Sequence, residues 1–232
     1  MMQVHEPAPV PDSQEQRRRD SQKLRRAVNW SLIAILILLA VYFGVQPLLN
    51  VPAWSIMPQS LYSWPGFFAA PLLHGSIEHL AANCISLAIL GPLTMLVYPR
   101  ATVRGLPLMW LGSGLGAWLL GTVGSHHLGA SGVTHGLLFL LMTIGLYRRD
   151  RPSIAAALIA FLFYGGMLLT VLPQEAGVSW QSHLGGAIGG ILAGIVFRNA
   201  DPIAERRRYA FENEPLPDED LPPVRDWDDF HR

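Results

Sequence analysis

Apolar residues dominate six long stretches of the chain, and short polar segments separate these stretches. Each is long enough to cross, or nearly cross, a hydrocarbon core of about 30 Å, which takes about 20 helical residues. We predict helices because the stretches lack the apolar/polar alternation of barrel strands and because backbone groups in lipid must bond internally. The predicted spans are Val28–Leu49, Ile77–Tyr98, Leu106–Val123, Gly129–Tyr147, Ile154–Leu172 and Trp180–Phe197. The pattern therefore predicts an all-α, polytopic membrane protein with six transmembrane helices.

The composition agrees with a membrane protein. Half of the 232 residues are hydrophobic and only 15% are charged, whereas a soluble domain has about a quarter of its residues charged. The formal net charge of zero argues against nucleic acid as the main partner. The single cysteine, Cys84, excludes an internal disulfide framework. The lipid bilayer is the expected environment.

Basic residues alternate between the two sides of the predicted helices. Of the 17, six precede the first span, two lie between the second and third, three lie between the fourth and fifth, and six follow the last. The positive-inside tendency then places both termini in the cytoplasm. We expect a basic tail over residues 1–27, a six-helix domain over 28–198, and an acidic, proline-rich, disordered tail over 199–232. Acidic residues in the first tail are unlike an organelle presequence, which makes a bacterial inner membrane the simplest location.

Polar residues gather near the outer ends of the second, fourth and sixth spans. Counted back from the cytoplasmic arginine that ends each span, Asn83, Ser131 and His183 lie 17, 17 and 15 residues away, which is roughly 22–26 Å above the inner surface. A single intramembrane Ser or His is more often an interhelical hydrogen-bonding group than a catalyst. The common depth on three helices, rather than any one residue, therefore indicates a functional site.

These side chains fit acyl transfer. Ser131 supplies a nucleophile and His183 a general base, and Glu78 is the only carboxylate near the same depth, so we predict a dyad rather than a triad. Ser131 lies in the first turn of its helix, where free N–H groups and the helix dipole favour a developing oxyanion. His79 and Asn83 lie four residues apart on one helix face and add side-chain donors.

Glycines allow the fourth and sixth spans to approach closely. Gly186 and Gly190 lie three and seven residues after His183, on the same helix face, and Gly132 and Gly136 have the same spacing on the fourth span. Small residues let two helix backbones meet without side chains between them.

The chain resembles the rhomboid intramembrane serine proteases across all six spans. A GxSG motif alone is a weak signal, but three motifs in order on the second, fourth and sixth spans are specific. They are H-x4-H-x3-N at His74, His79 and Asn83, GxSG at Gly129, Ala130, Ser131 and Gly132, and H-x2-G-x3-G at His183, Gly186 and Gly190.

The resemblance implies a function and a role for each residue. Ser131 would be the nucleophile, His183 the base, and His79, Asn83 and the Ser131 amide the oxyanion hole. The implied reaction is hydrolysis of a peptide bond in or near a transmembrane segment of a membrane-protein substrate, at a site open to the outer face. The resemblance implies no cofactor and no metal.

The chain also departs from the family pattern. Four residues after the nucleophile, where the family usually has an aromatic residue beneath the catalytic histidine, stands His135. A cation there would oppose protonation of His183, so we expect activity to be more pH-sensitive than with Tyr or Phe. The first outer loop lacks the Trp-Arg pair that is common in the family. We expect His74 to tie this loop to the site rather than to take part in the chemistry.

Three alternatives stay open. A catalytically silent rhomboid-like protein would bind membrane clients. A zinc hydrolase would use three of the six outer histidines, although HExxH spacing is missing. Of these histidines, we expect His126 and His127 to be a solvated pair. A transporter would need polar groups along a path through the membrane, and few lie inward of the site.

Overall fold

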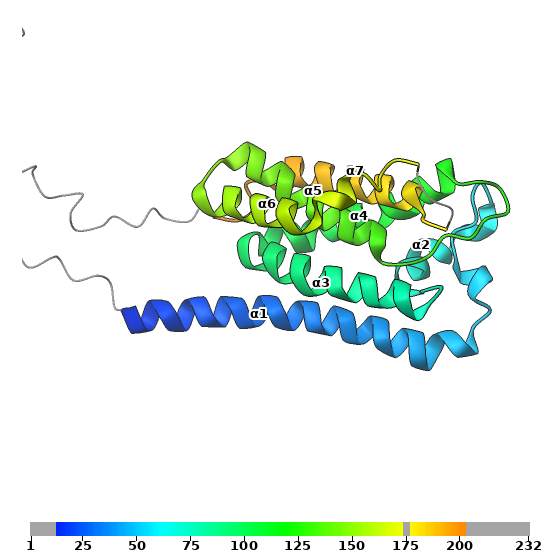
Figure 1. Ribbon diagram of the computed structural model, residues 1–232, viewed down its shortest axis with the longest axis horizontal. Coiled ribbons are helices and arrows are strands. Elements are labelled where there is room, and N and C mark those ends of the chain that lie inside the picture. Colours follow the sequence, from blue (N-terminus) through cyan, green and yellow to red (C-terminus); the bar gives the residue numbers. More distant parts are fainter. Residues whose placement is uncertain (1–12, 174–176, 203–232) are drawn as a thin grey trace, which may run out of the picture. The chain divides into compact units, whose positions relative to one another are not determined.

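The structure is a computed structural model that describes residues 13–173 and 177–202, and this part of the chain is helical. Strand pairing there is limited to one isolated antiparallel bridge between Ile56 and His127. Figure 1 shows the long helices α1 (Ser13–Ala40), α3 (Ile77–Val97), α4 (Pro99–Leu120), α5 (Ser131–Arg148), α6 (Arg151–Tyr164) and α7 (Trp180–Phe197). The shorter elements are η1 (Val41–Val45), η2 (Gln46–Leu48), η3 (Val51–Trp54), η4 (Leu61–Ser63), α2 (Gly66–Ala69), η5 (Ala70–Leu72) and η6 (Gly165–Leu168).

The chain divides into two compact units. One comprises Met1–Arg19 and Glu205–Arg232, and the other Asp20–Ala204. The first unit is described only over the opening turns of α1, and from residue 203 on the predicted disordered tail lies outside the described residues. The site lies entirely in the second unit.

Three helical segments in the described part of the chain are both long and apolar enough to cross a membrane. They are Arg17–Leu48, Ile77–Val97 and Arg151–Leu168. Helices α4, α5 and α7 have 22, 18 and 18 residues, but they are less apolar. Arginines near the start of α4, and the polar residues and glycines of α5 and α7, lower their hydropathy.

Helix α5 lies at the centre of the packing. Its residues Leu138, Leu140, Leu141 and Ile144 are fully buried, and they belong to the largest apolar cluster of the molecule. Both α4 and α5 make their most extensive contacts with α7. Neighbouring helices therefore cover the small and polar residues of α5 and α7, whereas α4 also exposes apolar side chains such as Leu111, Leu115 and Leu119.

The structure moves several predicted boundaries. Helix α1 begins at Ser13, so part of the predicted basic tail is helical. Helix α4 begins at Pro99 rather than Leu106, because the carboxylate of Asp201 accepts hydrogen bonds of 2.9 Å from the amides of Arg100 and Ala101 and caps the helix. Asp201 is buried, so the folded bundle extends beyond the predicted limit at residue 198.

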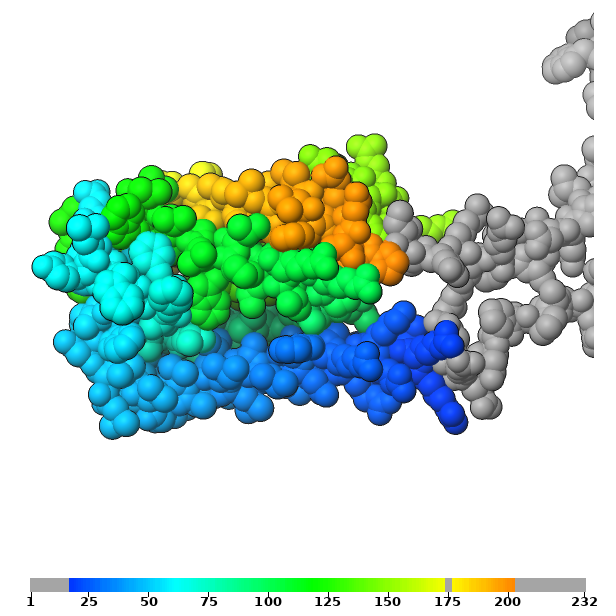
Figure 2. All heavy atoms as spheres, turned by 180° about the vertical axis from the view of Figure 1, so that it is seen from behind, coloured from blue at the N-terminus to red at the C-terminus, as the bar shows by residue number. Residues whose placement is uncertain are grey.

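The segment between α1 and α3 covers one end of the bundle. Figure 2 shows it in cyan beside the end of α1. The indole N–H groups of Trp110 and Trp118 hold it, donating 3.0 Å hydrogen bonds to the carbonyls of Phe67 and Ser60. Its own Trp64 is exposed, as suits an aromatic side chain at a membrane interface.

Candidate active site

Ser131 and His183 meet where α5 and α7 begin. Ser131 is the first residue of α5, and His183 lies in the first turn of α7. The Ser131 hydroxyl Oγ lies 2.9 Å from His183 Nε2, and the histidine is only 7% exposed. The two side chains are 52 residues apart in sequence and lie within the hydrogen-bonding distance that a nucleophile and its base require.

Glycines on two sides of α7 make this approach possible. A Cβ on Gly186 would overlap the Gly132 carbonyl of α5, and a Cβ on Gly190 would overlap the Gly136 carbonyl. The backbones therefore touch along the glycine stripe that the sequence spacing predicts. On its other side α7 contacts α4, where a Cβ on Gly185 would lie 2.9 Å from Gly116 Cα. Helix α7 is thus held between two neighbours at backbone contact.

A backbone carbonyl orients the His183 ring. His183 Nδ1 donates a 3.0 Å hydrogen bond to the carbonyl oxygen of Thr170, in the connection after η6. Because a carbonyl only accepts, the proton resides on Nδ1 and the lone pair of Nε2 faces Ser131. The Thr170 carbonyl takes the orienting place that an aspartate has in a triad. Glu78, the carboxylate that the sequence places near this depth, is exposed.

His135 lies flat against His183 and joins three parts of the site. The two rings are stacked at 3.9 Å between centroids, with 14° between their planes. His135 Nδ1 donates to the Ser131 carbonyl at 2.7 Å, and Nε2 lies 2.8 Å from the Thr170 hydroxyl. That hydroxyl also lies 3.0 Å from the Met167 carbonyl. The Thr170 hydroxyl can donate its hydrogen bond to Nε2 of a neutral His135. When His135 is protonated, Nε2 donates to the hydroxyl oxygen and the hydroxyl donates to the Met167 carbonyl, so both states of the ring have partners.

The residues predicted for an oxyanion hole lie around the same helix start. As the first residue of α5, Ser131 has an amide without an intrahelical acceptor. The His79 ring packs on Gly129, where a Cβ would lie 2.6 Å from Nε2, and Gly129 has a φ of +116° that favours glycine. Asn83 is buried, and its amide Nδ2 donates to the His79 carbonyl at 3.0 Å. One of the two Asn83 protons is therefore engaged within α3.

Comparison with known proteins identifies the family. The family model described as "Rhomboid domain" matches residues 61–200, more than half of the chain. The chain belongs to the rhomboid family. This family is polytopic, consists generally of intramembrane serine proteases and includes inactive members. With its three membrane-capable helices, this rhomboid is a membrane protein.

The rhomboid is also similar to uncharacterized mycobacterial proteins. It is 39% identical over 158 residues to proteins of Mycobacterium bovis and Mycobacterium tuberculosis, covering 65% of this chain and 61% of each relative. It is 39% identical over 136 residues to a protein of Mycobacterium leprae, covering 55% of this chain and 54% of the relative. The chain thus spans about three fifths of the length of the first of these relatives.

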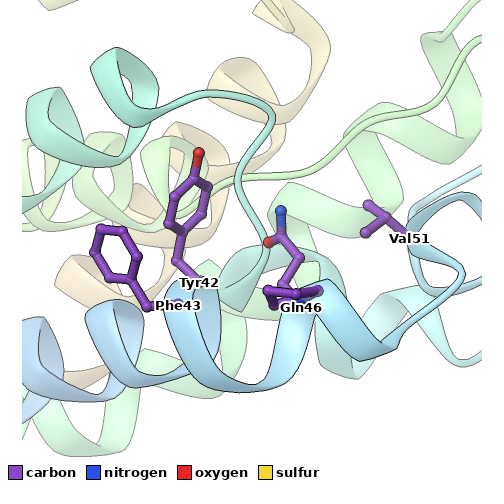
Figure 3. Close-up of a pocket in the computed structure, with 5 residues that line it drawn as sticks. Tyr42, Phe43, Gln46 and Val51 are labelled. Carbon is purple, nitrogen blue, oxygen red and sulfur yellow. The ribbon is translucent and has the colours of Figure 1, made fainter.

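In this rhomboid His74 connects the first loop to His79. Figure 3 shows the Gln46 side chain between Tyr42 and Val51. Its amide donates to the His74 carbonyl at 2.7 Å and accepts from the His74 amide at 3.0 Å. The His74 ring is fully buried and meets the His79 ring edge-on at 5.1 Å. Burial, with His79 beside it, lowers the pKa of His74 to about 4. A neutral His74 therefore supports His79 by packing.

The two histidines of the third loop differ from each other. His126 is exposed, as we expect from the sequence, and its Nδ1 lies 2.7 Å from the Ser55 hydroxyl. The expectation of solvation is wrong for His127, which is buried. Hydroxyl groups take the place of water at its ring nitrogens: Ser125 lies at 2.9 Å and Ser179 at 2.6 Å. Burial and the neighbouring His126 lower the pKa of His127. In the described part of the chain, no three His, Cys, Asp or Glu side chains are grouped as metal ligands.

Two residues of the site belong to none of the sequence motifs. Thr170 is 13 residues from His183, in a connection that belongs to no motif. Gln46 is 28 residues from His74 and stands at the end of an apolar stretch. A polar residue at the outer end of the first predicted span is the hint that the sequence offers for Gln46. Thr170 falls within the predicted fifth span, Ile154–Leu172, where the sequence does not distinguish it from an interhelical hydrogen-bonding group.

Proposed function

We propose that this rhomboid is an intramembrane serine endopeptidase that hydrolyses peptide bonds in or near transmembrane segments of membrane proteins. The hydrogen bond of 2.9 Å between Ser131 Oγ and His183 Nε2 carries the proposal. It is supported by the Thr170 carbonyl on Nδ1, because this bond directs the basic nitrogen at the nucleophile.

The reaction follows from these positions. His183 Nε2 takes the proton of Ser131 Oγ while the oxygen attacks the scissile carbonyl. The resulting oxyanion is stabilised by the Ser131 amide, by the positive end of the α5 dipole and by donors on His79 and Asn83. His183 then gives its proton to the leaving amine as the C–N bond breaks. Water, activated by the same nitrogen, hydrolyses the acyl-enzyme and restores the serine.

We propose six spans with both termini in the cytoplasm and the site near the outer face. The alternation of basic residues supports this orientation. The 18 residues of α5 and of α7 correspond to about 27 Å of helix, and the 22 of α4 to about 33 Å. These lengths suit a core of about 30 Å. The bacterial relatives support a bacterial inner membrane.

A serine-directed fluorophosphonate probe tests the proposal, together with cleavage of a model transmembrane substrate by purified protein in detergent. We expect the wild type to label and to cleave, Ser131→Ala and His183→Ala to do neither, and a chelator to change nothing. Ser182→Ala is the matched control, because its buried hydroxyl contacts Ser179, and it should keep labelling.

Other outcomes separate the alternatives. Loss of cleavage on chelation would favour a zinc hydrolase. A folded wild type that neither labels nor cleaves would refute the dyad and favour a silent rhomboid that binds membrane clients, which binding of the model segment without cleavage would then test.

A further inference from the structure

A groove lies on the surface between α5 and α6, away from the candidate active site. It is an open depression with a volume of about 460 Å³, a size within the range of ligand sites. Its walls are apolar and include Met142, Leu146, Ile154, Ala157, Leu158 and Phe161. Leu146, Leu158 and Phe161 are 67%, 61% and 51% exposed, so the groove opens toward the surroundings of the bundle.

The α5–α6 groove has a cationic end. Arg149 lines it where α5 ends and α6 begins, and its Nε donates to the Leu146 carbonyl at 3.1 Å. The neighbouring Arg148 is engaged differently: its guanidinium pairs with Asp150 at 2.9 Å and donates to the carbonyls of Asp201 and Pro202. Asp150 also caps α6. Among the described residues no carboxylate pairs with Arg149, and Arg151 beside it is exposed.

We propose that the α5–α6 groove binds an anionic phospholipid. The phosphate lies against Arg149, and one acyl chain runs along α6 from Ile154 toward Phe161, about 10 Å away. A basic residue at the cytoplasmic end of an apolar cleft between transmembrane helices is complementary to such a lipid in both charge and shape. The location in the inner leaflet rests on the proposed topology, but the binding does not depend on the proposed catalysis.

The charge distribution selects the lipid class. The local surplus of positive charge comes from Arg149 and Arg151, because Arg148 and Asp150 neutralise each other. A zwitterionic lipid would bring its own cation to the same place and gain less. The groove should therefore prefer phosphatidylglycerol over phosphatidylcholine with the same acyl chains.

Native mass spectrometry of the full chain in neutral detergent, titrated with either lipid, tests the proposal. Loss of one basic residue facing an anionic headgroup should weaken binding of phosphatidylglycerol about fivefold. We expect this for Arg149→Gln and not for Arg149→Lys. The control Arg104→Gln removes an exposed arginine at the start of α4, outside the groove, and should leave binding unchanged.

A second pair of variants tests the apolar part. Leu158→Trp fills the groove at an exposed position, so folding should be retained and binding lost. Leu192→Trp changes a leucine of α7 that is 49% exposed and does not line the groove, and should have no effect. Equal binding of both lipids, or equal losses in the variants and their controls, would overturn the proposal. So would a dimer that Leu158→Trp dissociates without any lipid preference, because a second copy would then occupy the groove.

Discussion

Substitution of Gly186 by alanine should separate Ser131 from His183 while leaving the protein folded. The added Cβ would overlap the Gly132 carbonyl oxygen and lie 2.5 Å from the Gly132 carbonyl carbon and 3.0 Å from its Cα, where ordinary contact begins at 3.4 Å. Both partners are helix backbone and cannot rotate away. Helices α5 and α7 must therefore move apart by roughly 1 Å, because close-packed interiors transmit such strain.

The energetic and catalytic effects differ in size. Overpacking costs about 1–3 kcal/mol, and the better helix propensity of alanine returns about 1 kcal/mol, so a net loss of about 0–2 kcal/mol is expected. A shift of 1 Å lengthens the 2.9 Å contact between Ser131 and His183 beyond hydrogen-bonding distance. A misplacement of this size can reduce activity about 100-fold.

The rate of fluorophosphonate labelling and the thermal unfolding temperature, measured on the same preparation, separate these effects. Gly44→Ala is the matched control, because nothing lies within 4 Å of a Cβ at that position. It should label at the wild-type rate and be equally or slightly more stable. Labelling of Gly186→Ala within twofold of wild type would show that the backbone contact does not set the geometry of the pair.

Three further predictions concern the surroundings of the pair. His135→Tyr should flatten the pH profile of activity. In the wild type a protonated His135, stacked on His183, opposes formation of the His183 imidazolium, so activity should fall more steeply as the pH decreases. Identical pH profiles for the two proteins would contradict this. Thr170→Val should lower kcat about threefold to tenfold with KM unchanged, since one hydrogen bond to His135 is lost, whereas Thr170→Ser should restore kcat. Asp201→Asn should lower the free energy of unfolding by about 1 kcal/mol, since it replaces one of the two oxygens that accept from the Arg100 and Ala101 amides with a donor, and should leave the labelling rate unchanged.

Sequence patterns predict the helices better than their ends. The predicted span from Ile77 and the structure's α3 agree within one residue at the far end, because a continuous apolar stretch has few alternatives in lipid. The start of α4 could not be predicted from its own residues. Two arginines in its first turns resemble a loop, and the Asp201 carboxylate that caps the helix comes from 100 residues away.

The candidate site shows the same division. The depth of Ser131 and His183 can be counted along their own helices, so their common level can be predicted from local periodicity, whereas their contact depends on the packing of α5 against α7. The carbonyl that orients His183 cannot be found in this way, because any residue can supply a backbone oxygen and only the folded connection after α6 selects Thr170. Burial of His127 likewise depends on Ser179, which is 52 residues away.

The position of His183 on α7, which follows α5 in the chain, has a consequence for biosynthesis. Ribosomes release α5 first, and at that stage the nascent chain has a serine at a helix start but no base beside it. The pair forms only when α7 emerges and inserts its glycine stripes between α4 and α5. The proposed nucleophile therefore gains its base only after α1 to α6 have been synthesised. Chains that stop before α7 would thus lack the proposed pair, and the proposed cleavage of membrane proteins would begin only in molecules that contain both helices.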